Sequence, residues 1–264
     1  MKIYITTSGR SERQATLKNL PEELRNQVIL VVQKKEEKLY REKYDDQVNQ
    51  IISLPKNINT LSPTRDWIVY DYHNLKKDGN FAVLLDDDLK FDTRRKDEPD
   101  KFITSTPKDV VKIFQEIEKE LRSGVGHVGV LSREGGNRTL AAKVYNQRMV
   151  RVLAYDVSTI RAIKAKFGRL RCMSDFDMTL QLLRAGFPNT ILCKWVNGQG
   201  SSNAEGGCSK YRTKEVLAES AKGLKKLHSD FVTLVEKETK GAWGGGKRTD
   251  VMIQWKKAYA SSQR

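Results

Sequence analysis

Three adjacent aspartates are the first residues in the chain whose types and spacing could do chemistry. Residues 81–85 have the length and composition of a buried strand, and Asp86, Asp87 and Asp88 follow it with no turn residue between. Consecutive carboxylates repel one another unless a cation or solvent screens them. Mg²⁺ and Mn²⁺ take oxygen ligands and often keep positions for substrate phosphates. The pattern therefore favours a metal that bridges Asp86 and Asp88 to a diphosphate, over a solvated acidic turn.

A second acidic pair, Asp175 and Asp177, opens a helix predicted over residues 174–186. Ser174 is predicted as its N-cap and Gly186 as the residue that ends it. Both carboxylates complement the helix dipole and complete a capping box. This structural role explains Asp177 well and leaves Asp175 available as a general base for an acceptor hydroxyl. The two aspartates are the candidate catalytic residues.

Small polar residues and arginines are placed to bind a nucleotide. The strand predicted over residues 2–6 ends in Thr6 and runs into a turn with Ser8 and Arg10, whose exposed amides and hydroxyls could reach a base or phosphate. A helix is predicted over residues 63–72, with Arg65 in its first turn. A cation opposes the helix dipole there, so we expect Arg65 to pair with a phosphate or an aspartate.

The stretch 198–212 is rich in glycine and small polar residues and ends in the cations Lys210 and Arg212. Such a loop can wrap a diphosphate with its backbone amides, while the two cations supply counter-charge. The alternative is a mobile surface loop. We favour the diphosphate-binding role, because a basic pair follows the glycine-rich part directly.

Positive charge is concentrated in the second half of the chain. The net charge is +15, of which residues 1–130 carry +1 and residues 131–264 carry +14. Residues 133–171 hold seven Arg and three Lys against Glu134 and Asp156. Such a block attracts polyanions, with nucleic acid the commonest, and the excess of arginine favours phosphate contact over solvated surface charge. The candidate DNA contacts are Arg133, Arg138, Arg148, Arg151, Arg169 and Arg171.

The elements that must position these residues are strands alternating with helices. Further strands are predicted at 27–32, 51–52, 127–131 and 150–155, and further helices at 14–20, 106–121, 213–237 and 251–259. Segment 34–46 is predicted to be solvated, 92–105 to be a charged loop and 132–138 a flexible basic loop. His228, inside the predicted helix 213–237, is expected to be a surface or packing residue rather than a ligand. This order predicts an α/β fold with a mainly parallel central sheet and helices on both faces.

Length and composition predict one intracellular domain. The chain of 264 residues is 38% hydrophobic, and no apolar run reaches the roughly 18 residues of a membrane-spanning helix. Its first residues lack the layout of a signal peptide, which favours a cytoplasmic location. The three cysteines fit no disulfide framework and no zinc spacing, so Cys172, Cys193 and Cys208 are expected to be free thiols. The tail, 240–248, could contact nucleic acid or link to a final helix.

Together these parts resemble the GT-A class of nucleotide-sugar glycosyltransferases, over roughly residues 1–235. The resemblance rests on the opening strand with its small turn and arginine, the Thr-Arg helix, Leu-Leu-Asp86-Asp87-Asp88, and the Asp175-Phe-Asp177 start of a leucine-rich helix. More narrowly, the chain is similar to the TET-associated phage and kinetoplastid group related to the base J glucosyltransferase, which glycosylates hydroxymethylated pyrimidines in DNA.

The resemblance implies a role for each motif. Asp86 and Asp88 would bind Mn²⁺ or Mg²⁺, and Asp87 would lie near the donor. Thr6, Ser8, Arg10 and Arg65 would line the nucleotide-sugar site, and Asp175 would be the general base of inverting members. Many GT-A enzymes supply a late histidine as third metal ligand, and the glycine-rich stretch has none, so that ligand stays open.

The expected activity is metal-dependent transfer of a sugar, glucose from a uridine diphosphate donor, onto a hydroxymethylated pyrimidine of double-stranded DNA. Residues 1–130 would carry the donor chemistry, 131–240 the acceptor, and 241–264 a basic tail. A protein or glycan acceptor is the nearest alternative. A metal-dependent nuclease is a second, because clustered carboxylates and a basic surface also suit phosphodiester cleavage. A non-enzymatic nucleic-acid binder would leave both acidic clusters unexplained.

Overall fold

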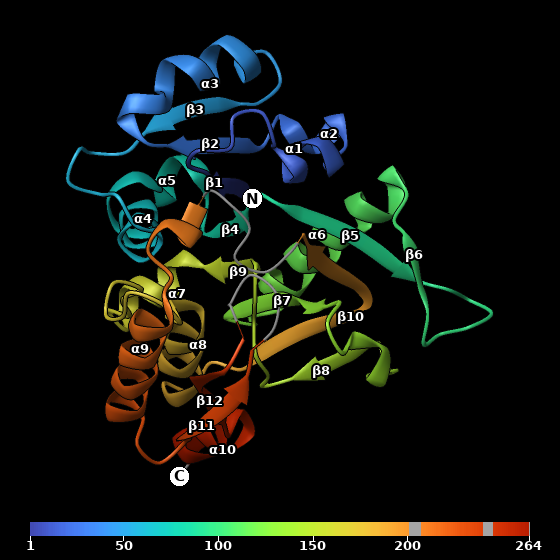
Figure 1. Ribbon diagram of the computed structural model, residues 1–264. Helices are drawn as coiled ribbons and strands as arrows, with labels where there is room; N and C mark the ends of the chain where they lie inside the picture. Colours follow the sequence, from blue (N-terminus) through green and yellow to red (C-terminus); the bar gives the residue numbers. More distant parts are fainter. Residues whose placement is uncertain (201–206, 240–244, 264) are drawn as a thin grey trace.

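A ten-stranded sheet organises the computed structural model, which describes residues 1–200, 207–239 and 245–263, with the side chain of Lys210 left aside (Figure 1). The strand order is β3-β2-β1-β4-β9-β7-β10-β5-β6, and β8 also pairs with β10. Three strands, β5, β8 and β9, run against the other seven. The mostly parallel sheet predicted from the sequence is thereby confirmed. The strands are β1 (Lys2–Thr6), β2 (Val28–Val32), β3 (Gln50–Ser53), β4 (Phe81–Asp86), β5 (Leu89–Arg94), β6 (Phe102–Thr104), β7 (His127–Ser132), β8 (Lys143–Tyr145), β9 (Val152–Asp156) and β10 (Asn189–Gln199).

Helices cover both faces of the sheet, as predicted, because side chains alternate along each strand. On β1, Ile3 and Ile5 join a core with one set of helices, whereas Tyr4 joins a core with the other set. The first set is α1 (Ala15–Asn19), α2 (Glu22–Arg25), α3 (Glu37–Tyr44) and α6 (Pro107–Arg122), and the second is α4 (Leu61–Trp67), the π-helical turn η2 (Ile68–Tyr72), α7 (Val157–Ala162) and α8 (Ser174–Arg184).

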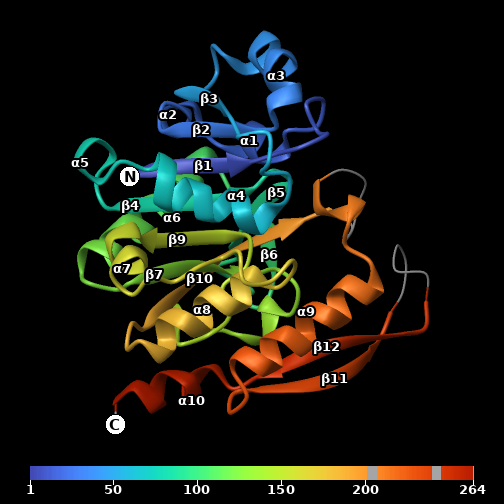
Figure 2. The ribbon, with the colours of Figure 1, turned by 90° about the vertical axis from the view of Figure 1, so that its left-hand side faces the viewer.

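A third, smaller core lies on the outer side of α8. There Leu180 and Leu183 of α8 pack with Leu224, Val232 and Val251. These partners belong to α9 (Lys214–Leu227) and to an antiparallel hairpin of β11 (Val232–Glu238) and β12 (Lys247–Ile253), which α10 (Trp255–Ala260) follows. Figure 2 shows α9 beside α8, with the hairpin below both. The remaining short elements are η1 (Lys34–Glu36), α5 (Leu75–Asp78), η3 (Gly136–Arg138), η4 (Gly207–Lys210) and η6 (Ser261–Gln263).

Several predicted elements near the C-terminus were wrong. The helix predicted over 213–237 ends at Leu227, and β11 follows with β-branched residues that favour a strand. The helix predicted over 251–259 is the end of β12 followed by α10. The long strand β10 was not predicted at all. Residues 240–244 of the predicted tail lie outside the described part of the chain.

Two segments predicted as solvated or irregular are also ordered elements. Segment 34–46 contains the helix α3, in which Tyr40 is fully buried. Tyr40 and Tyr44 are four residues apart, so they lie on one helix face, and that face packs against the core. Segment 92–105 holds the end of β5 and the edge strand β6. By contrast, the helix predicted over 106–121 is confirmed as α6, and Thr106 and Asp109 form a capping box at its start. Within the described residues, no helix is long and apolar enough to cross a membrane.

Candidate functional site

The ends of two neighbouring parallel strands bring the first predicted motifs together. β1 pairs with β4 so that Thr6 lies opposite Asp86, and the turn after β1 therefore meets the aspartates at one edge of the sheet. Asp87 is buried and accepts hydrogen bonds from Thr7 Oγ1 and Arg10 Nη1, both at 2.6 Å. Asp88 accepts from the same Arg10 nitrogen at 3.0 Å. One arginine thus holds two of the three aspartates.

Arg65 holds the remaining aspartate. Its Nη2 donates to Asp86 Oδ1 at 3.1 Å and its Nη1 to Ser174 Oγ at 3.4 Å. With 4% of its surface exposed, Arg65 joins α4, β4 and α8 from inside the protein. The expected pairing of Arg65 with an aspartate is therefore present. The helix begins at Leu61, so Arg65 lies in its second turn rather than the first, and Pro63 occupies an early position whose N–H would have no helical partner.

A cavity of about 180 Å³ opens beside these carboxylates and contains most of the predicted donor residues. Val31, Leu54 and Asn59 line its other side. At its edge Gly207 donates from its backbone N–H to Ser8 O at 3.0 Å. A Cβ on Gly207 would lie 3.6 Å from the Arg10 guanidinium carbon, and its φ of +54° favours glycine. We call this space the donor cavity; its predicted residues are Thr6, Ser8, Arg10, Asp86, Asp87, Asp88 and Arg212.

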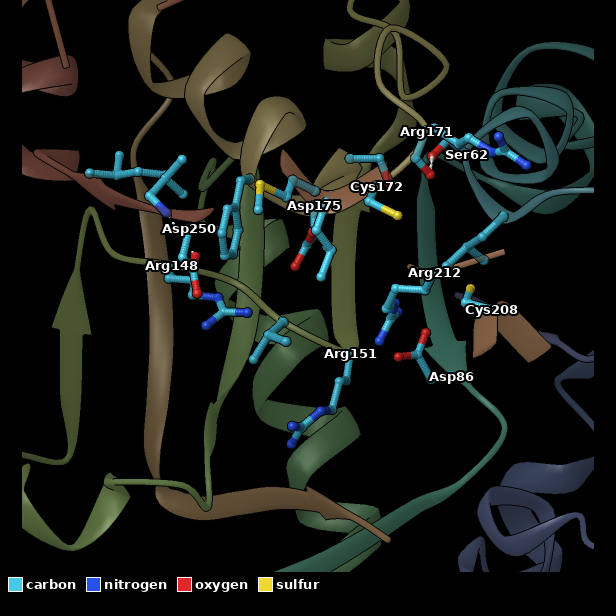
Figure 3. Close-up of a pocket in the computed structure, with 18 of the residues that line it drawn as sticks. Ser62, Asp86, Arg148, Arg151, Arg171, Cys172, Asp175, Cys208, Arg212 and Asp250 are labelled. Carbon is cyan, nitrogen blue, oxygen red and sulfur yellow. Dashed lines mark hydrogen bonds between the residues drawn. The ribbon is translucent and has the colours of Figure 1, made fainter. Parts of the chain in front are cut away.

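A second cavity, of about 370 Å³, adjoins the first, and the two share Asp86, Tyr211 and Arg212 in their walls. Figure 3 shows Asp86 and Arg212 at one side of this space and Asp175 and Arg148 towards the other. We call it the acceptor cavity, because it contains Asp175, the predicted base for an acceptor hydroxyl. It is also lined by Arg65, Arg151 and Arg171, and by the C-terminal residues Lys237, Arg248, Asp250 and Trp255.

Asp175 and Asp177 occupy different environments although they are two residues apart. Asp175 lines the acceptor cavity, and no described residue donates a hydrogen bond to its carboxylate or forms an ion pair with it. Asp177 is fully buried and accepts from Arg169 Nη2 at 2.9 Å, His228 Nε2 at 2.8 Å and Gln181 Nε2 at 3.1 Å. Asp177 therefore faces the protein interior, and His228 is the packing residue expected from the sequence.

The start of α8 differs from the predicted capping box. Its N-cap is Met173, in the left-handed conformation with φ of 64°, and no side chain caps the helix. Ser174, predicted as the cap, is instead the acceptor for Arg65. Arg151, which also lines the acceptor cavity, has φ of 64° as well. A left-handed residue other than glycine costs about 1–2 kcal/mol, and such strain gathers at functional sites.

The six arginines predicted to contact DNA fall into two groups. Arg148, Arg151 and Arg171 line the acceptor cavity, and Arg133, Arg138 and Arg169 do not. Arg133 pairs with Asp92, and Arg169 pairs with Asp177. Arg151 is held by Glu134 through two hydrogen bonds of 2.9 and 3.0 Å.

Arg148 lines the acceptor cavity and stacks on an aromatic ring. Its guanidinium carbon lies 4.2 Å from the centre of the Phe176 ring, and it forms no ion pair with a described residue. Burial lowers the pKa of Arg148, with Asp175 opposing the shift. Its side chain nevertheless remains exposed to solvent, because it extends into the cavity.

Burial also raises the pKa of the carboxyls at the end of β4. The pKa of Asp87 is raised to about 6, although Arg10 acts in the opposite direction. Burial raises the pKa of Asp86 as well, with Arg65 opposing it. A cation that arrived between these carboxylates would favour their charged forms.

Comparison with known proteins identifies the family. A model described as "TET-Associated Glycosyltransferase" matches residues 1–207. The chain belongs to this glycosyltransferase family.

Two relatives, each named beta-glucosyl-HMC-alpha-glucosyl-transferase, come from Enterobacteria phages T6 and T2. Each is 23% identical over 214 residues, which cover 76% of this chain and 71% of the relative. A glucosyl-3-phosphoglycerate synthase from Mycobacterium tuberculosis, solved with Mn²⁺, uridine diphosphate and glucosyl-3-phosphoglycerate, is 10% identical, with a TM-score of 0.49 over 94% of this chain and 86% of its own. The resemblance to the TET-associated group is confirmed.

In this glycosyltransferase, part of the acceptor cavity lies beyond the matched residues. Tyr211 and Arg212 follow directly after position 207, and the hairpin and α10 add Arg248, Asp250 and Trp255. Of these five residues, Arg212 was predicted to bind the nucleotide sugar, and Arg248 lies in the tail 240–248 that was predicted as a possible nucleic-acid contact. The apolar residues at the end of β12 were interpreted as part of a helix, so the hairpin was missed.

The metal site predicted for this glycosyltransferase would have two protein carboxylates. Asp86 and Asp88 both line the donor cavity, with 28% and 24% of their side chains exposed. In the described parts of the chain, no group of three His, Cys, Asp or Glu side chains comes together as a metal site. Mg²⁺ is often bound by one or two carboxylates together with substrate phosphates, so this pair fits such an ion. Residues 201–206 of the glycine-rich stretch, and the side chain of Lys210, lie outside the described part.

Proposed function

We propose that this glycosyltransferase moves a glucosyl unit from uridine diphosphate glucose to the hydroxymethyl group of a modified pyrimidine in double-stranded DNA, with Mn²⁺ or Mg²⁺. One observation carries the proposal: two adjoining cavities share Asp86 and Arg212, and they differ in chemistry. The donor cavity holds the three aspartates of the β4 end, and the acceptor cavity holds Asp175 among arginines. A sugar attached to a diphosphate at the shared wall would face Asp175.

The donor residues suit a nucleoside diphosphate. Asp86 and Asp88 would hold the divalent ion, which would offset the negative charge that develops on the leaving diphosphate. Arg212 lines both cavities and would add a second positive charge at the same place. Ser8 and Arg10 line the donor cavity next to Asp87 and would contact the nucleotide.

The acceptor residues suit deprotonation of a hydroxyl. Asp175 would take the proton as the hydroxyl oxygen forms a bond to the anomeric carbon and the bond from that carbon to the diphosphate breaks. The diphosphate leaves with the electron pair of that bond. Arg148, Arg151 and Arg171 would contact phosphates next to the modified nucleotide. Asp177 has no part in this proposal, because its carboxylate is buried and already has three donors.

The names of the relatives support a second acceptor. Both are named for transfer of an α-glucosyl unit to β-glucosyl-hydroxymethylcytosine, so a base that already bears glucose is the alternative here. The donor sugar is itself α-linked to its diphosphate. An α-linked product would therefore retain the configuration at the anomeric carbon, and the leaving diphosphate, not Asp175, would then be the nearest proton acceptor on the reacting face.

A transfer assay tests the proposal. Uridine diphosphate glucose and other nucleotide sugars are offered with plain, hydroxymethylated and glucosylated duplexes, with Mn²⁺ or with a chelator. We expect transfer to a modified duplex that stops with the chelator and in Asp88→Ala. Asp92→Ala is the matched control, because Asp92 is a carboxylate on β5 that lines neither cavity.

Other outcomes of the assay select other activities. Transfer that persists in Asp88→Ala would contradict the metal site. Turnover of the donor onto a protein or glycan, with no DNA product, would contradict the acceptor. Strand breaks without transfer would indicate a nuclease. The coupling constant of the anomeric proton in the product, measured by NMR, separates inversion from retention.

A further inference from the structure

A third cavity, of about 310 Å³, lies at the far end of α8 from the acceptor cavity, and cations line it. Its polar walls are Arg169, Gln181, Arg184 and His228. The carboxylate in contact with these walls is that of Asp177, which is fully buried behind them. The two arginines thus face the opening with one buried counter-charge between them.

The arginines keep hydrogen-bond donors for a ligand. Arg184 uses Nη1, which donates to Leu227 O at 3.1 Å and to His228 Nδ1 at 3.0 Å. Arg169 uses Nη2 for Asp177. The Nε and the other terminal nitrogen of each guanidinium make no hydrogen bond to a described residue. Paired guanidinium groups with free N–H donors are a typical phosphate site.

The third cavity is connected to the acceptor cavity by one basic segment. The loop between α7 and α8 carries Arg171 at the acceptor cavity and Arg169 at the third cavity. Lys164 and Lys166 of this loop are exposed. Figure 2 shows that α8, which joins the two cavities, lies along α9. A strand of nucleic acid that followed this loop would meet cations along its whole course.

The length of α8 sets the spacing between the two positions. Asp175 stands in its first turn and Arg184 is its last residue. The nine steps from Asp175 to Arg184, at about 1.5 Å each, extend about 14 Å. B-DNA rises about 3.4 Å per base pair, so this length corresponds to about four base pairs.

We infer that the third cavity binds a backbone phosphate of the acceptor DNA, about four base pairs from the modified base. The inference rests on the proposed function, because it takes DNA as the acceptor. It explains two cations, Arg184 and Arg169, that lie outside both reaction cavities. It also gives the DNA a direction on the enzyme, because one flank of the modified base would be bound and the other would not.

Duplexes of different length and asymmetry test the inference. One duplex carries ten base pairs on both sides of the modified base, and two others carry two base pairs on one side or the other. We expect the wild type to show a KM about fivefold higher for one of the short-flank duplexes than for the other. In Arg184→Gln this difference is lost, the KM for the long duplex rises about fivefold, and the slope of log affinity against log salt falls by about 1.

Controls keep the result interpretable. Arg122→Gln removes an exposed arginine of α6, on the other face of the sheet, and should leave the KM unchanged. Arg184→Lys keeps the positive charge, so the slope of log affinity against log salt should stay as in the wild type. This variant keeps the test possible if Arg184→Gln folds poorly. An unchanged flank preference in Arg184→Gln would overturn the inference. A second outcome would also overturn it: inorganic phosphate inhibits transfer by the wild type but not by Arg184→Gln, and flank length has no effect. The site would then bind a free anion rather than DNA.

Failure of the proposed function is measured separately. Binding of unmodified duplex to Asp175→Asn, followed by fluorescence anisotropy, needs no transfer. If duplexes bind with the Arg184-dependent flank preference and no sugar is transferred, the reaction proposal fails and this inference stands. If transfer occurs without the preference, the inference alone fails.

Discussion

The donor cavity and the acceptor cavity differ in how their charged groups are paired. Each aspartate at the end of β4 has an arginine partner, Arg65 for Asp86 and Arg10 for Asp87 and Asp88. In the acceptor cavity, Asp175 and Arg148 form no ion pair with a described residue. The three aspartates of the donor side are therefore held in place before a nucleotide binds. The acceptor side has paired groups too, Arg151 with Glu134 and Arg248 with Asp250, but it keeps Asp175 and Arg148 available for its ligand.

Two buried histidines differ in how many of their ring nitrogens are bonded. His73 has both bonded, Nδ1 to Tyr4 Oη at 2.8 Å and Nε2 to Gly79 O at 2.7 Å. On β7, His127 Nε2 donates to Phe187 O at 3.1 Å, and its Nδ1 has no described partner. Other buried atoms without a described partner include Tyr155 Oη, Trp195 Nε1 and Asn197 Oδ1, and also Gln14 Oε1 and Arg65 Nε.

The largest effect is expected from Asp175→Asn. Because the unpaired carboxylate is proposed to take the proton of the acceptor, kcat should fall about 100- to 10,000-fold. The KM for the donor should change little, since no residue of the donor cavity is altered. Transfer assays at saturating donor and DNA give both values, and the melting temperature should match that of the wild type because the side chain has no partner to lose.

Asp177→Asn provides the contrast. It leaves the acceptor cavity unchanged but weakens the buried contacts with Arg169 and His228, so it should lower stability first and activity only through stability. Normal kcat in Asp175→Asn would remove the general-base role and support the retaining reaction.

The second effect compares two aspartates of the donor cavity. Asp86→Ala leaves Arg65, which is 4% exposed, without its carboxylate, and should lower the free energy of unfolding by about 3 kcal/mol. Asp88→Ala should cost less than about 1 kcal/mol, because its partner Arg10 is still paired with Asp87. Urea unfolding measures both. Equal losses would show that the pairing with Arg65 contributes no more than a surface ion pair.

The donor side was largely predictable from the sequence because its motifs are local. Asp86–Asp88 follow a strand directly, the turn to Arg10 follows another, and parallel pairing of β1 and β4 brings the two strand ends together. Only the partners were left open, since pairing of Arg65 with Asp86 depends on how α4 packs. The burial of Tyr40 against Thr7 was missed for the same reason.

The acceptor side was less predictable because its walls come from distant segments. Asp177 looked like a helix-capping residue, and its burial depends on His228, 51 positions further along the chain. Trp255 and Arg248 reach the cavity only because β12 pairs with β11 and packs on α8. Charge counting selected six arginines as DNA contacts, but their place in the fold decides that Arg148, Arg151 and Arg171 line the cavity.

The third effect tests the unpaired nitrogen of His127. Burial lowers the pKa of His127 to about 3, so between pH 3 and its ordinary value near 6.5 the unfolded chain binds a proton that the folded protein does not. Stability is therefore fully present above pH 6.5 and is lost as the pH falls. At pH 5 the loss should be about 2 kcal/mol.

Urea unfolding of His127→Phe at pH 7 and pH 5 checks this sign. The substitution removes the titrating ring, so the decrease between the two pH values should be smaller than in the wild type by about the same 2 kcal/mol. Burial lowers the pKa of His73 too, and that residue leaves a remaining decrease in both proteins. Loss of the bond to Phe187 O acts at both pH values and cancels from the comparison. Identical decreases would show that His127 is protonated equally in the folded and unfolded states.

The smallest effect is expected at Trp255, and it separates the two cavities most directly. Trp255 lines the acceptor cavity and its ring centre lies 5.8 Å from that of Phe176, in an edge contact. Trp255→Ala removes this aromatic wall, so the KM for DNA should rise about fivefold, which is about 1 kcal/mol. Hydrolysis of the donor in the absence of DNA should be unchanged, because Trp255 does not line the donor cavity. Trp255→Phe keeps a ring and should recover most of the loss. A matching fall in donor hydrolysis would mean that the hairpin and α10 support both cavities. The distinction between the donor cavity and the acceptor cavity would then not extend to the C-terminal residues.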